Sequence, residues 1–470
     1  MQNIILIGLG PHAKKIYIKL FKKHKLIPKL IVDLDINKNK IKEYLKEEKL
    51  DFVDTYFVSS LDANLNTLNK KVQIDLKDKI KKYQITHAII STEPKAHLSY
   101  AKFLIKNNIN VLMDKPITSP CNVLNNKQAA RCITKEYLTL TNLYRNHYTK
   151  MNFAIQCQRR YHVGYIYIKN LLTNIVKKYN VPITYIDIYH SDGMWNMPNE
   201  FFERENHPYK YGYGKLFHSG YHFVDLLTWL LECNDNLGNN KQIDNATIYA
   251  TTFKPVDFFK TIDNSFYQEH LNTNKFKEIL NKPDLVRDFG ELDFHAMIDF
   301  KQDDNILTHC SLNLMQSGFS KRAWVDLPID TYKANGRLRH ERINIQVGPL
   351  MNIQIHSYQA NEINDQDKLP KDSIGGMDHF DIYIFRNTKI IGGEVFEKIS
   401  LKDLDREKEE FLGNNEKARE NCFLEYLSDK KQDSDLLKHQ KSILLLTKLC
   451  ESIASGEHII NFKWRDFYEK

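Results

Sequence analysis

The chain has 470 residues, with 42% hydrophobic and 27% charged side chains, which is long enough for two globular domains and too apolar for a disordered chain. Its formal charge of +8 comes from lysines scattered over the whole length, so no basic arm or nucleic-acid module is indicated. The seven cysteines form no Cys-x-x-Cys pair and no apolar run approaches the roughly 18–20 residues of a membrane span, so we expect a cytoplasmic protein that binds neither nucleic acid nor a membrane.

The first expected element is a buried strand over residues 3–7 that runs into a glycine turn. The turn has the pattern Gly8-x-Gly10-x-x-Ala13 and precedes a helical pattern over residues 14–23. Gly8 permits the tight turn, Gly10 leaves room for a pyrophosphate at the helix N-terminus, and Ala13 allows the helix to pack closely on the strand. The pattern therefore predicts a phosphate-binding turn.

The second expected strand favours a dinucleotide as the ligand of that turn. It covers residues 28–33 and ends in Asp33, about 20 positions after the glycines, where a ribose 2′-hydroxyl would sit. The carboxylate of Asp33 would repel a 2′-phosphate, and Lys38 is the only nearby residue that argues for one. We therefore expect NAD in preference to NADP.

Strands and helices continue to alternate along the chain. A helix is expected over residues 76–83, a buried strand over 87–92, a further helix that starts near Pro94, and a short strand over 111–114. This alternation predicts a parallel sheet with crossover helices.

Three motifs of this first half resemble one family: Gly8-Leu-Gly10, Ser91-Thr92-Glu-Pro94-x-x-His97, and Asp114-Lys115-Pro116. They are similar to those of the glucose-fructose oxidoreductase/inositol dehydrogenase (Gfo/Idh/MocA) family of NAD(P)-dependent sugar and polyol oxidoreductases, which has Glu-Lys-Pro at the third place. The resemblance implies that Lys115 is the catalytic lysine and that the Lys115–Pro116 bond is cis, which a tertiary amide permits. It also implies a set of cofactor-binding residues: Gly8, Gly10, Pro11, His12, Ala13, Asp33, Ser91, Thr92, Glu93, His97, Asp114, Lys115 and Pro116.

The second half of the sequence has the pattern of a sheet. Alternating strands are expected over residues 183–190, 247–253, 292–300 and 307–315, followed by a long run over 338–358. Consecutive strands without helices between them favour antiparallel pairing. The expected fold is thus an N-terminal α/β Rossmann domain and a C-terminal α+β domain with an open-faced, mainly antiparallel sheet and helices. The resemblance implies that the free face of this sheet forms a homodimer or homotetramer.

The segment GKLFHSGYHFVDLL, residues 214–227, places His218, His222 and Asp225 on one face of an expected helix. The residues alone leave three interpretations open: a metal site, a proton-transfer site, and histidines that are merely hydrogen-bonded core residues. The family resemblance favours the second, with His222 at the place of the catalytic histidine and His218 in place of an aspartate. Gly220 is expected to let the substrate or the nicotinamide approach closely.

These residues predict oxidation of a secondary alcohol. His222 is the expected base, Lys115 hydrogen-bonds the reacting oxygen, and His218 orients His222 or binds a neighbouring hydroxyl, so that Lys115, His218 and His222 also count as substrate-binding residues. Asp225 is a candidate to replace part of the missing negative charge. Trp195 lies in an aromatic loop suited to a polyhydroxylated substrate.

Two further sets of side chains have open alternatives. No metal is expected, since the family chemistry uses none, and the metal alternative would need His190 or His207 as a third ligand. The arginines Arg337, Arg339 and Arg342 suit either a carboxylate or phosphate on a modified sugar or a solvated strand edge.

We expect a nucleotide-binding domain over residues 1–145, a substrate and oligomerisation domain over 146–435 with insertions at 256–287 and 361–376, and a closing helix within 436–470 that packs back on the first domain. The function indicated is an NAD-dependent oxidoreductase of a sugar, an inositol or a sugar derivative. The alternatives are an NAD-using non-redox enzyme of the glycoside-elimination type and a catalytically inactive, cofactor-sensing regulator.

Overall fold

The computed structural model describes residues 2–62, 66–204, 207–326, 336–360, 379–404, 414–428 and 430–464. The chain divides into two compact units, each built from three segments. Unit 1 contains Met1–Pro120, Cys132–Tyr161 and Asn415–Gln440, and unit 2 contains Cys121–Arg131, His162–Asn414 and Lys441–Lys470. Within the described ranges, no helix has the length and apolar character needed to cross a membrane.

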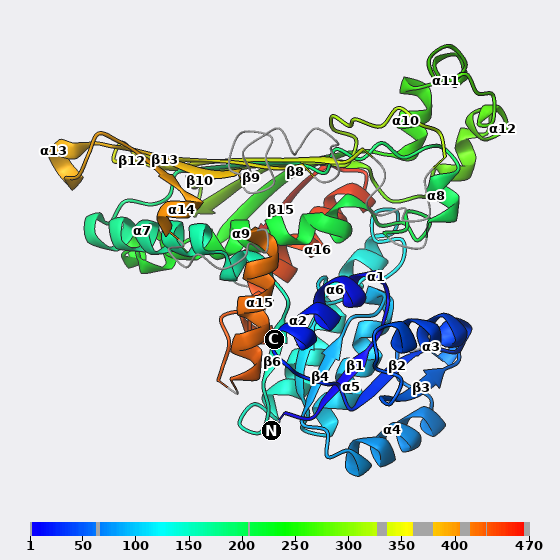
Figure 1. The fold of residues 1–470 in the computed structure, drawn as a ribbon. Helices are drawn as coiled ribbons and strands as arrows, with labels where there is room; N and C mark the ends of the chain where they lie inside the picture. The colour runs from blue at the N-terminus through cyan, green and yellow to red at the C-terminus, as the bar shows by residue number, and fades with distance from the viewer. Residues whose placement is uncertain are drawn as a thin grey trace. The chain divides into compact units, whose positions relative to one another are not determined.

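Unit 1 contains a six-stranded parallel sheet in the order β3-β2-β1-β4-β5-β6. Its strands are β1 (Ile4–Ile7), β2 (Leu30–Leu34), β3 (Asp54–Val58), β4 (His87–Ile90), β5 (Asn110–Met113) and β6 (Phe153–Ile155). Its helices are α1 (Pro11–Ala13), α2 (Lys19–Lys23), α3 (Lys38–Glu47), α4 (Lys70–Lys82), α5 (His97–Lys106), α6 (Lys127–Arg145) and α15 (Asn414–Leu427), and the first turn of α6 is assigned to unit 2 (Figure 1). Strands β1 and β6 are fully apolar and buried, as expected where both faces of a parallel sheet are covered.

Helix α15 is the part of unit 1 that comes from far along the chain. Ala418, Cys422, Phe423 and Tyr426 belong to the same buried apolar cluster as residues of β1 and α2. The hydroxyl of Tyr426 donates hydrogen bonds to the carbonyl oxygens of Ala88 (3.0 Å) and Asn110 (3.2 Å). The helix expected to return to this domain was the later one within 436–470. The structure instead places the chain from Lys441 onward in unit 2.

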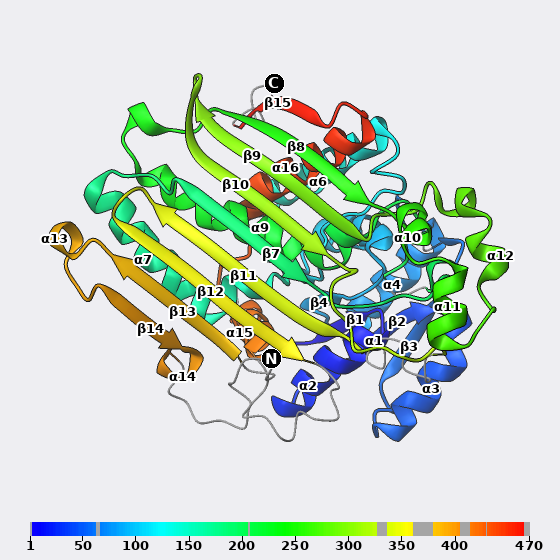
Figure 2. The same ribbon diagram turned by 90° about the horizontal axis from the view of Figure 1, so that it is seen from above.

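Unit 2 contains a nine-stranded mixed sheet in the order β14-β13-β12-β11-β7-β10-β9-β8-β15 (Figure 2). Its strands are β7 (Tyr185–Ser191), β8 (Asn245–Phe253), β9 (Asp293–Gln302), β10 (Asn305–Met315), β11 (Leu338–Val347), β12 (Met351–Ala360), β13 (His379–Arg386), β14 (Phe396–Ser400) and β15 (Ile459–Lys463). All neighbours are antiparallel except the parallel pair β7–β10. The long run expected over 338–358 is therefore two strands, which are joined by a turn at residues 348–350.

One face of this sheet is a ladder of buried isoleucines. Ile186 and Ile188 of β7 lie opposite Ile345 and Ile343 of β11 in register, and β11 continues the ladder to β12 and β13. Such cross-strand β-branched pairs are a main source of sheet stability. Helices α7 (Val163–Tyr179), α9 (Tyr221–Leu231) and α16 (Gln440–Ala454) lie on one face of the sheet (Figure 1).

The remaining helices of unit 2 are short: α8 (Glu200–Glu203), α10 (Pro255–Thr261), α11 (Asn264–Leu271), α12 (Lys277–Leu280), α13 (Thr388–Ile391) and α14 (Leu401–Leu404). Helices α10 to α12 fill the expected insertion at 256–287. Phe258, Phe259 and Tyr267 from these helices form a buried cluster with Phe201 and Tyr209. The insertion thus supports the loops that follow β7, whereas the expected insertion at 361–376 lies outside the described residues.

Candidate functional site

The glycine turn after β1 has the geometry of a phosphate-binding turn. Gly8 adopts φ +91°, and a Cβ there would lie 2.4 Å from the carbonyl oxygen of Ser91, so only glycine fits. A Cβ on Gly10 would meet nothing within 4 Å. Gly10 immediately precedes the first helical turn at Pro11, so this open space lies where a helix N-terminus attracts an anion. The turn therefore fits the pyrophosphate of a dinucleotide.

Asp33 lies beside the same turn, at the end of β2. Its Oδ2 accepts a hydrogen bond from the Leu9 N–H (2.6 Å), and its Oδ1 accepts from the Leu34 N–H (2.7 Å) and from Asn37 Nδ2 (2.9 Å). Lys14 adds a nearby cation: burial lowers its pKa, and Asp33 opposes that shift. Lys14 and Asn37 are neighbours of the ribose position that the sequence reasoning missed, although both lie within one helical turn of the motif residues.

Asp114 connects three elements of unit 1. Its Oδ1 accepts a hydrogen bond from the hydroxyl of Tyr17 and its Oδ2 from the hydroxyl of Ser91, both at 2.6 Å. His12 Nε2 lies 3.7 Å from Oδ2. Burial, together with the charge of Asp114, raises the pKa of Tyr17 well above its usual value, so Tyr17 is a constant hydrogen-bond donor. Asp114 thus fixes the strand end from which Lys115 extends, and Tyr17 is a partner that no motif indicated.

The Lys115–Pro116 peptide bond is cis, as expected. His97 is wholly buried; its Nδ1 lies 2.9 Å from the carbonyl oxygen of Pro116 and its Nε2 lies 3.2 Å from that of Thr92. The imidazole therefore ties the two loops together, and a contact of His97 with the cofactor stays a prediction. The other expected cofactor residues lie in the turns after β1, β4 and β5: Pro11, His12, Ala13, Ser91, Thr92, Glu93 and Pro116.

In unit 2 the expected helix is present, but it starts with a π-helical turn over Leu216–Gly220 that continues as α9. His218 and His222 are only 6% and 8% exposed. The His218 ring lies 4.9 Å from the ring of His207, with which it stacks, and 5.0 Å from that of Tyr209. Single π-turns inside helices are frequent at functional sites because they re-aim side chains.

Glu291 holds the N-terminus of this helix. Its carbonyl oxygen accepts the Lys215 N–H (2.9 Å), and its Oε1 accepts the Leu216 N–H (2.6 Å). The residue is fully buried, and this burial raises the pKa of its carboxyl group to about 7. A carboxylate near a helix N-terminus interacts favourably with the helix dipole. The charge state of Glu291 therefore affects the stability of the helical segment that carries His218.

A buried ion cluster around Asp192 holds the same turn from the other side. Its carboxylate binds Lys215 Nζ (2.5 Å), the Ser219 hydroxyl (2.6 Å) and Arg337, with Arg339 Nε at 3.5 Å. Burial alone would raise the pKa of Asp192, but Arg337 and Lys215 outweigh it and hold that pKa well below its usual range. Burial lowers the pKa of Lys215 to about 8. Arg337 and Arg339 therefore face an internal carboxylate, which corrects their assignment as candidates for a ligand or for a solvated edge.

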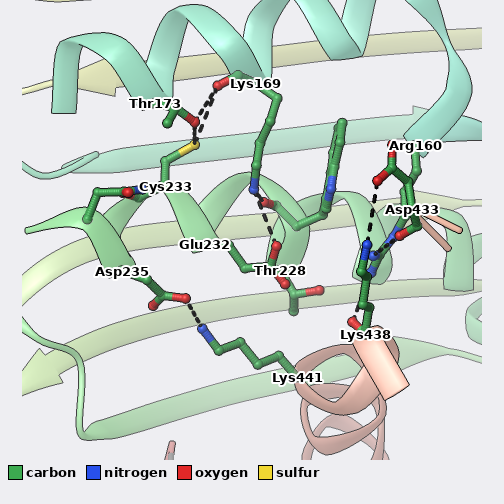
Figure 3. A network of polar contacts seen from close by, with 12 residues as sticks. Arg160, Lys169, Thr173, Thr228, Glu232, Cys233, Asp235, Asp433, Lys438 and Lys441 are labelled. Carbon is green, nitrogen blue, oxygen red and sulfur yellow. Dashed lines mark hydrogen bonds and ion pairs between the residues drawn. The ribbon is translucent and has the colours of Figure 1, made fainter. Parts of the chain in front are cut away.

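The C-terminal half of α9 is anchored by its neighbours (Figure 3). Lys169 of α7 donates to the carbonyl oxygen of Trp229 and lies 3.4 Å from Glu232. Asp225 is fully buried and accepts a hydrogen bond from Ser442 of α16 (2.8 Å). Asp225 is thus a tie between two helices, which corrects its candidacy as a replacement for the family's aspartate.

Three further expectations are resolved within unit 2. A Cβ on Gly220 would lie 2.7 Å from the carbonyl oxygen of Lys215 and 2.9 Å from Leu314, so packing explains this glycine and no ligand needs to be invoked. His190 lies between the carboxylates of Asp192 (3.5 Å) and Glu341 (3.4 Å). Within the described ranges, neither His190 nor His207 completes a three-ligand group with the two histidines of the helix.

The remaining predicted side chains lie at the margins of these groups. Arg342 packs over the ring of Tyr189, with its guanidinium 4.9 Å from the ring centroid. Trp195 is half-buried against the aromatic cluster of the insertion. The structure thus places the residues expected to bind the cofactor in unit 1 and both histidines on one helical segment of unit 2, whereas the pairing of Lys115 with His222 stays a prediction.

Known structures are similar to this chain along nearly its whole length, at low sequence identity. Aldose-aldose oxidoreductase from Caulobacter crescentus, solved with glycerol, has a TM-score of 0.56 and 10% identity over 98% of this chain and 100% of its own. Levoglucosan dehydrogenase, solved with NADH and levoglucosan, has a TM-score of 0.58 and 11% identity, over 99% of this chain and 100% of its own. WlbA dehydrogenase from Bordetella pertussis, solved with NADH and UDP-GlcNAcA, has a TM-score of 0.54 and 12% identity, over 98% of this chain and 97% of its own. These likenesses show the shared fold.

No curated protein sequence matches the chain. Residues 2–142 match the family model described as "Oxidoreductase family, NAD-binding Rossmann fold". The expected fold class is confirmed by this match together with the parallel sheet of unit 1 and the mainly antiparallel sheet of unit 2. The resemblance seen in the motifs is thus confirmed, because residues 2–142 match the model of the Gfo/Idh/MocA oxidoreductase family.

Proposed function

We propose that the protein is an NAD-dependent oxidoreductase that transfers hydride between the nicotinamide and a secondary hydroxyl or ketone of a sugar, an inositol or a sugar derivative. The observation that carries this proposal is the family-matching nucleotide domain, in which Lys115 directly follows Asp114, the carboxylate held by Tyr17 and Ser91. The dinucleotide would lie along Gly8, Gly10 and Asp33.

In this proposal the residues of the chain divide the work of alcohol oxidation. NAD, when bound, supplies a hydride acceptor. His222 removes the proton of the reacting hydroxyl, and the ammonium group of Lys115 hydrogen-bonds the same oxygen and stabilises its developing negative charge. His218, whose ring packs on His207 and Tyr209, binds a neighbouring hydroxyl or orients His222. The Asp192 cluster and Glu291 keep this turn in one geometry, because both bind its backbone or side chains.

Single substitutions at the two proposed catalytic residues test the assignment. Lys115→Met or His222→Asn should lower kcat by roughly 10²- to 10⁴-fold and leave the affinity for NAD near that of the wild type, because general acid-base catalysis is typically of that size. NAD reduction should first be screened over a panel of polyols, sugars and nucleotide sugars. Calorimetry then measures the affinity for NAD.

The matched control is Lys106→Met, which removes an exposed lysine at the end of α5 and should leave turnover unchanged. A fully active Lys115→Met variant, combined with activity that a chelator abolishes and zinc restores, would contradict hydride transfer and favour the metal alternative. NAD binding without turnover of any substrate, in the wild type as in the variants, would favour the regulatory alternative.

A further inference from the structure

Two arginines of unit 2 lie buried, Arg204 after β7 and Arg322 after β10, and their surroundings differ. Arg322 is fully provided with acceptors. Its guanidinium forms a bidentate ion pair with Glu200 (2.7 and 3.0 Å) and donates to the carbonyl oxygens of Trp195 (2.7 Å), Trp324 (2.9 Å) and Val325 (2.7 Å). A buried charge with its counter-charge and all its hydrogen bonds in place is a structural element.

Arg204 lacks such partners. Its side chain is 7% exposed, and both of its side-chain hydrogen bonds use Nη1, to Asn196 Oδ1 (2.6 Å) and Met194 Sδ (3.1 Å). Within the described part of the chain, Nε is buried without an acceptor. Across the described ranges of the chain, no carboxylate forms an ion pair with Arg204, since the nearby Glu200 is engaged by Arg322. Among the described residues the guanidinium of Arg204 thus has no counter-charge, and a buried guanidinium without one is costly.

Arg204 is connected to His218, the histidine of the π-turn, through two other residues. Asn196, which accepts from Arg204, is also within hydrogen-bonding distance of the Tyr209 hydroxyl (3.4 Å). The Tyr209 ring packs edge-on against His218, 5.0 Å between centroids. The four residues thus form one continuous chain of contacts within unit 2. Arg204 and His218 are therefore linked through two intervening residues, Asn196 and Tyr209.

We propose that the substrate is anionic, and that its carboxylate or phosphate group binds the Nε–Nη2 edge of Arg204. This edge presents two parallel N–H donors, the arrangement that binds carboxylate and phosphate oxygens in pairs. The inference rests on the proposed function for the identity of the reacting sugar, and it narrows the substrate class to sugar acids and sugar phosphates.

The test compares one neutral sugar with its two anionic derivatives. D-glucose, D-glucuronate and D-glucose 6-phosphate are titrated into the full-length protein saturated with NADH, and calorimetry measures the affinities. At least one anion should bind more than tenfold tighter than glucose, and the better of the two identifies carboxylate or phosphate as the natural group. Arg204→Met should weaken the binding of that anion by about 10- to 100-fold and leave the binding of glucose unchanged.

Two further variants make the result specific. Arg204→Lys keeps the charge but not the paired donors, so it should retain part of the anion preference, and it also serves if the methionine variant does not fold. Arg342→Met removes an exposed cation of the same unit and should change nothing. Equal affinity for glucose and both anions in the wild type, or an anion preference that survives Arg204→Met, overturns the inference.

The outcomes also separate this inference from the proposed function. Binding of an anion that depends on Arg204, without reduction of NAD by any sugar, would support the anion site and contradict the redox assignment. Oxidation of neutral sugars without any preference for anions would support the redox assignment and contradict the anion site.

Discussion

Asp33 is a residue with two tasks in unit 1. A carboxylate offers about four acceptor positions, and the Leu9 N–H, the Leu34 N–H and Asn37 occupy three of them. These bonds attach the carboxylate to the glycine turn and leave one position for a ribose hydroxyl. If a dinucleotide binds as proposed, the charge that positions the turn would also oppose a 2′-phosphate at that place.

Replacing Asp33 should change the preference between the two dinucleotides. Asp33→Ser removes the charge, so the ratio of the NADP and NAD dissociation constants should fall towards one, helped by the nearby cation of Lys14. Calorimetric titration with both cofactors measures this ratio. Asp33→Asn is the matched control, because its amide oxygen can still accept the Leu9 N–H. It separates the loss of charge from the loss of the hydrogen bond. Tighter binding of NADP than of NAD by the wild type would contradict the assignment.

At this scale the sequence predicted the residues that carry local backbone signals. Gly8 and Asp33 could be predicted from the sequence, because the turn and the end of the next strand fix their spacing along the chain. The contact of His97 with the carbonyl oxygen of Pro116 and the pairing of Asp192 with Arg337 were not predicted, since the partners lie 19 and 145 positions apart in the chain. Residue type alone does not tell a buried ion cluster from a ligand site, and here it assigned Arg337 to the wrong alternatives.

At the scale of one element, the helix with His218 and His222 depends on a carboxyl group with an unusual pKa. Glu291 has a fully buried side chain, with one oxygen bound to the Leu216 N–H and the other without a hydrogen-bond partner among the described residues. Burial raises its pKa to about 7 from an ordinary value of 4.5. The folded protein therefore holds this proton more tightly than the unfolded chain does.

This raised pKa predicts a stability that depends on pH. Below about pH 4.5 the carboxyl of Glu291 is protonated in both the folded and the unfolded state, so its burial costs no folding stability. As the pH rises the unfolded chain loses this proton first, so the loss of folding stability grows and is complete above about pH 7. Glu291→Gln removes the titration, so the free energy of unfolding of the variant relative to the wild type should increase between pH 5 and pH 8 by on the order of 2–3 kcal/mol. Urea unfolding at both pH values measures it.

The control for this experiment is Glu451→Gln. Burial alone would raise the pKa of Glu451, but Lys448 and Arg131 outweigh it and lower that pKa, so this group is ionised at both pH values. Its replacement should give the same loss of stability at pH 5 and pH 8. A Glu291→Gln variant that behaves in this pH-independent way would contradict the buried, near-neutral carboxyl.

Helices and strands with a clear periodicity of apolar residues were predictable, and the irregular or exposed elements were not. The helix around His222 was expected from its apolar face, but the π-turn at Leu216–Gly220 depends on Glu291 and Asp192, which lie elsewhere in the chain. The edge strands β14 and β15 have few buried residues, so hydrophobic alternation is weak there. Their pairing with β13 and β8 defines them.

At the scale of the whole molecule, chain order and spatial order differ. The segment Asn415–Gln440 belongs to unit 1, while the chain before it and after it belongs to unit 2. The amphipathic pattern over residues 436–455 showed that a helix exists, but an apolar face does not say which of two cores it covers. The return to unit 1 is made by α15, whose helical period is weak and whose buried contacts come from only a few large side chains.

This arrangement predicts that the nucleotide-binding unit needs α15 to fold. A fragment ending at Tyr161 would expose the surfaces that Cys422, Phe423 and Tyr426 cover, and each such side chain contributes roughly 1.5–3 kcal/mol, against about 5–15 kcal/mol for the net stability of a domain. We expect the fragment to lack a cooperative thermal transition and to give no NADH fluorescence enhancement. Joining Asn415–Gln440 to Tyr161 by a flexible linker should restore both, and Phe423→Ala in that fusion should lower its stability by about 3–5 kcal/mol. A fragment 1–161 that melts cooperatively and binds NADH like the fusion would show that the nucleotide-binding unit folds without α15.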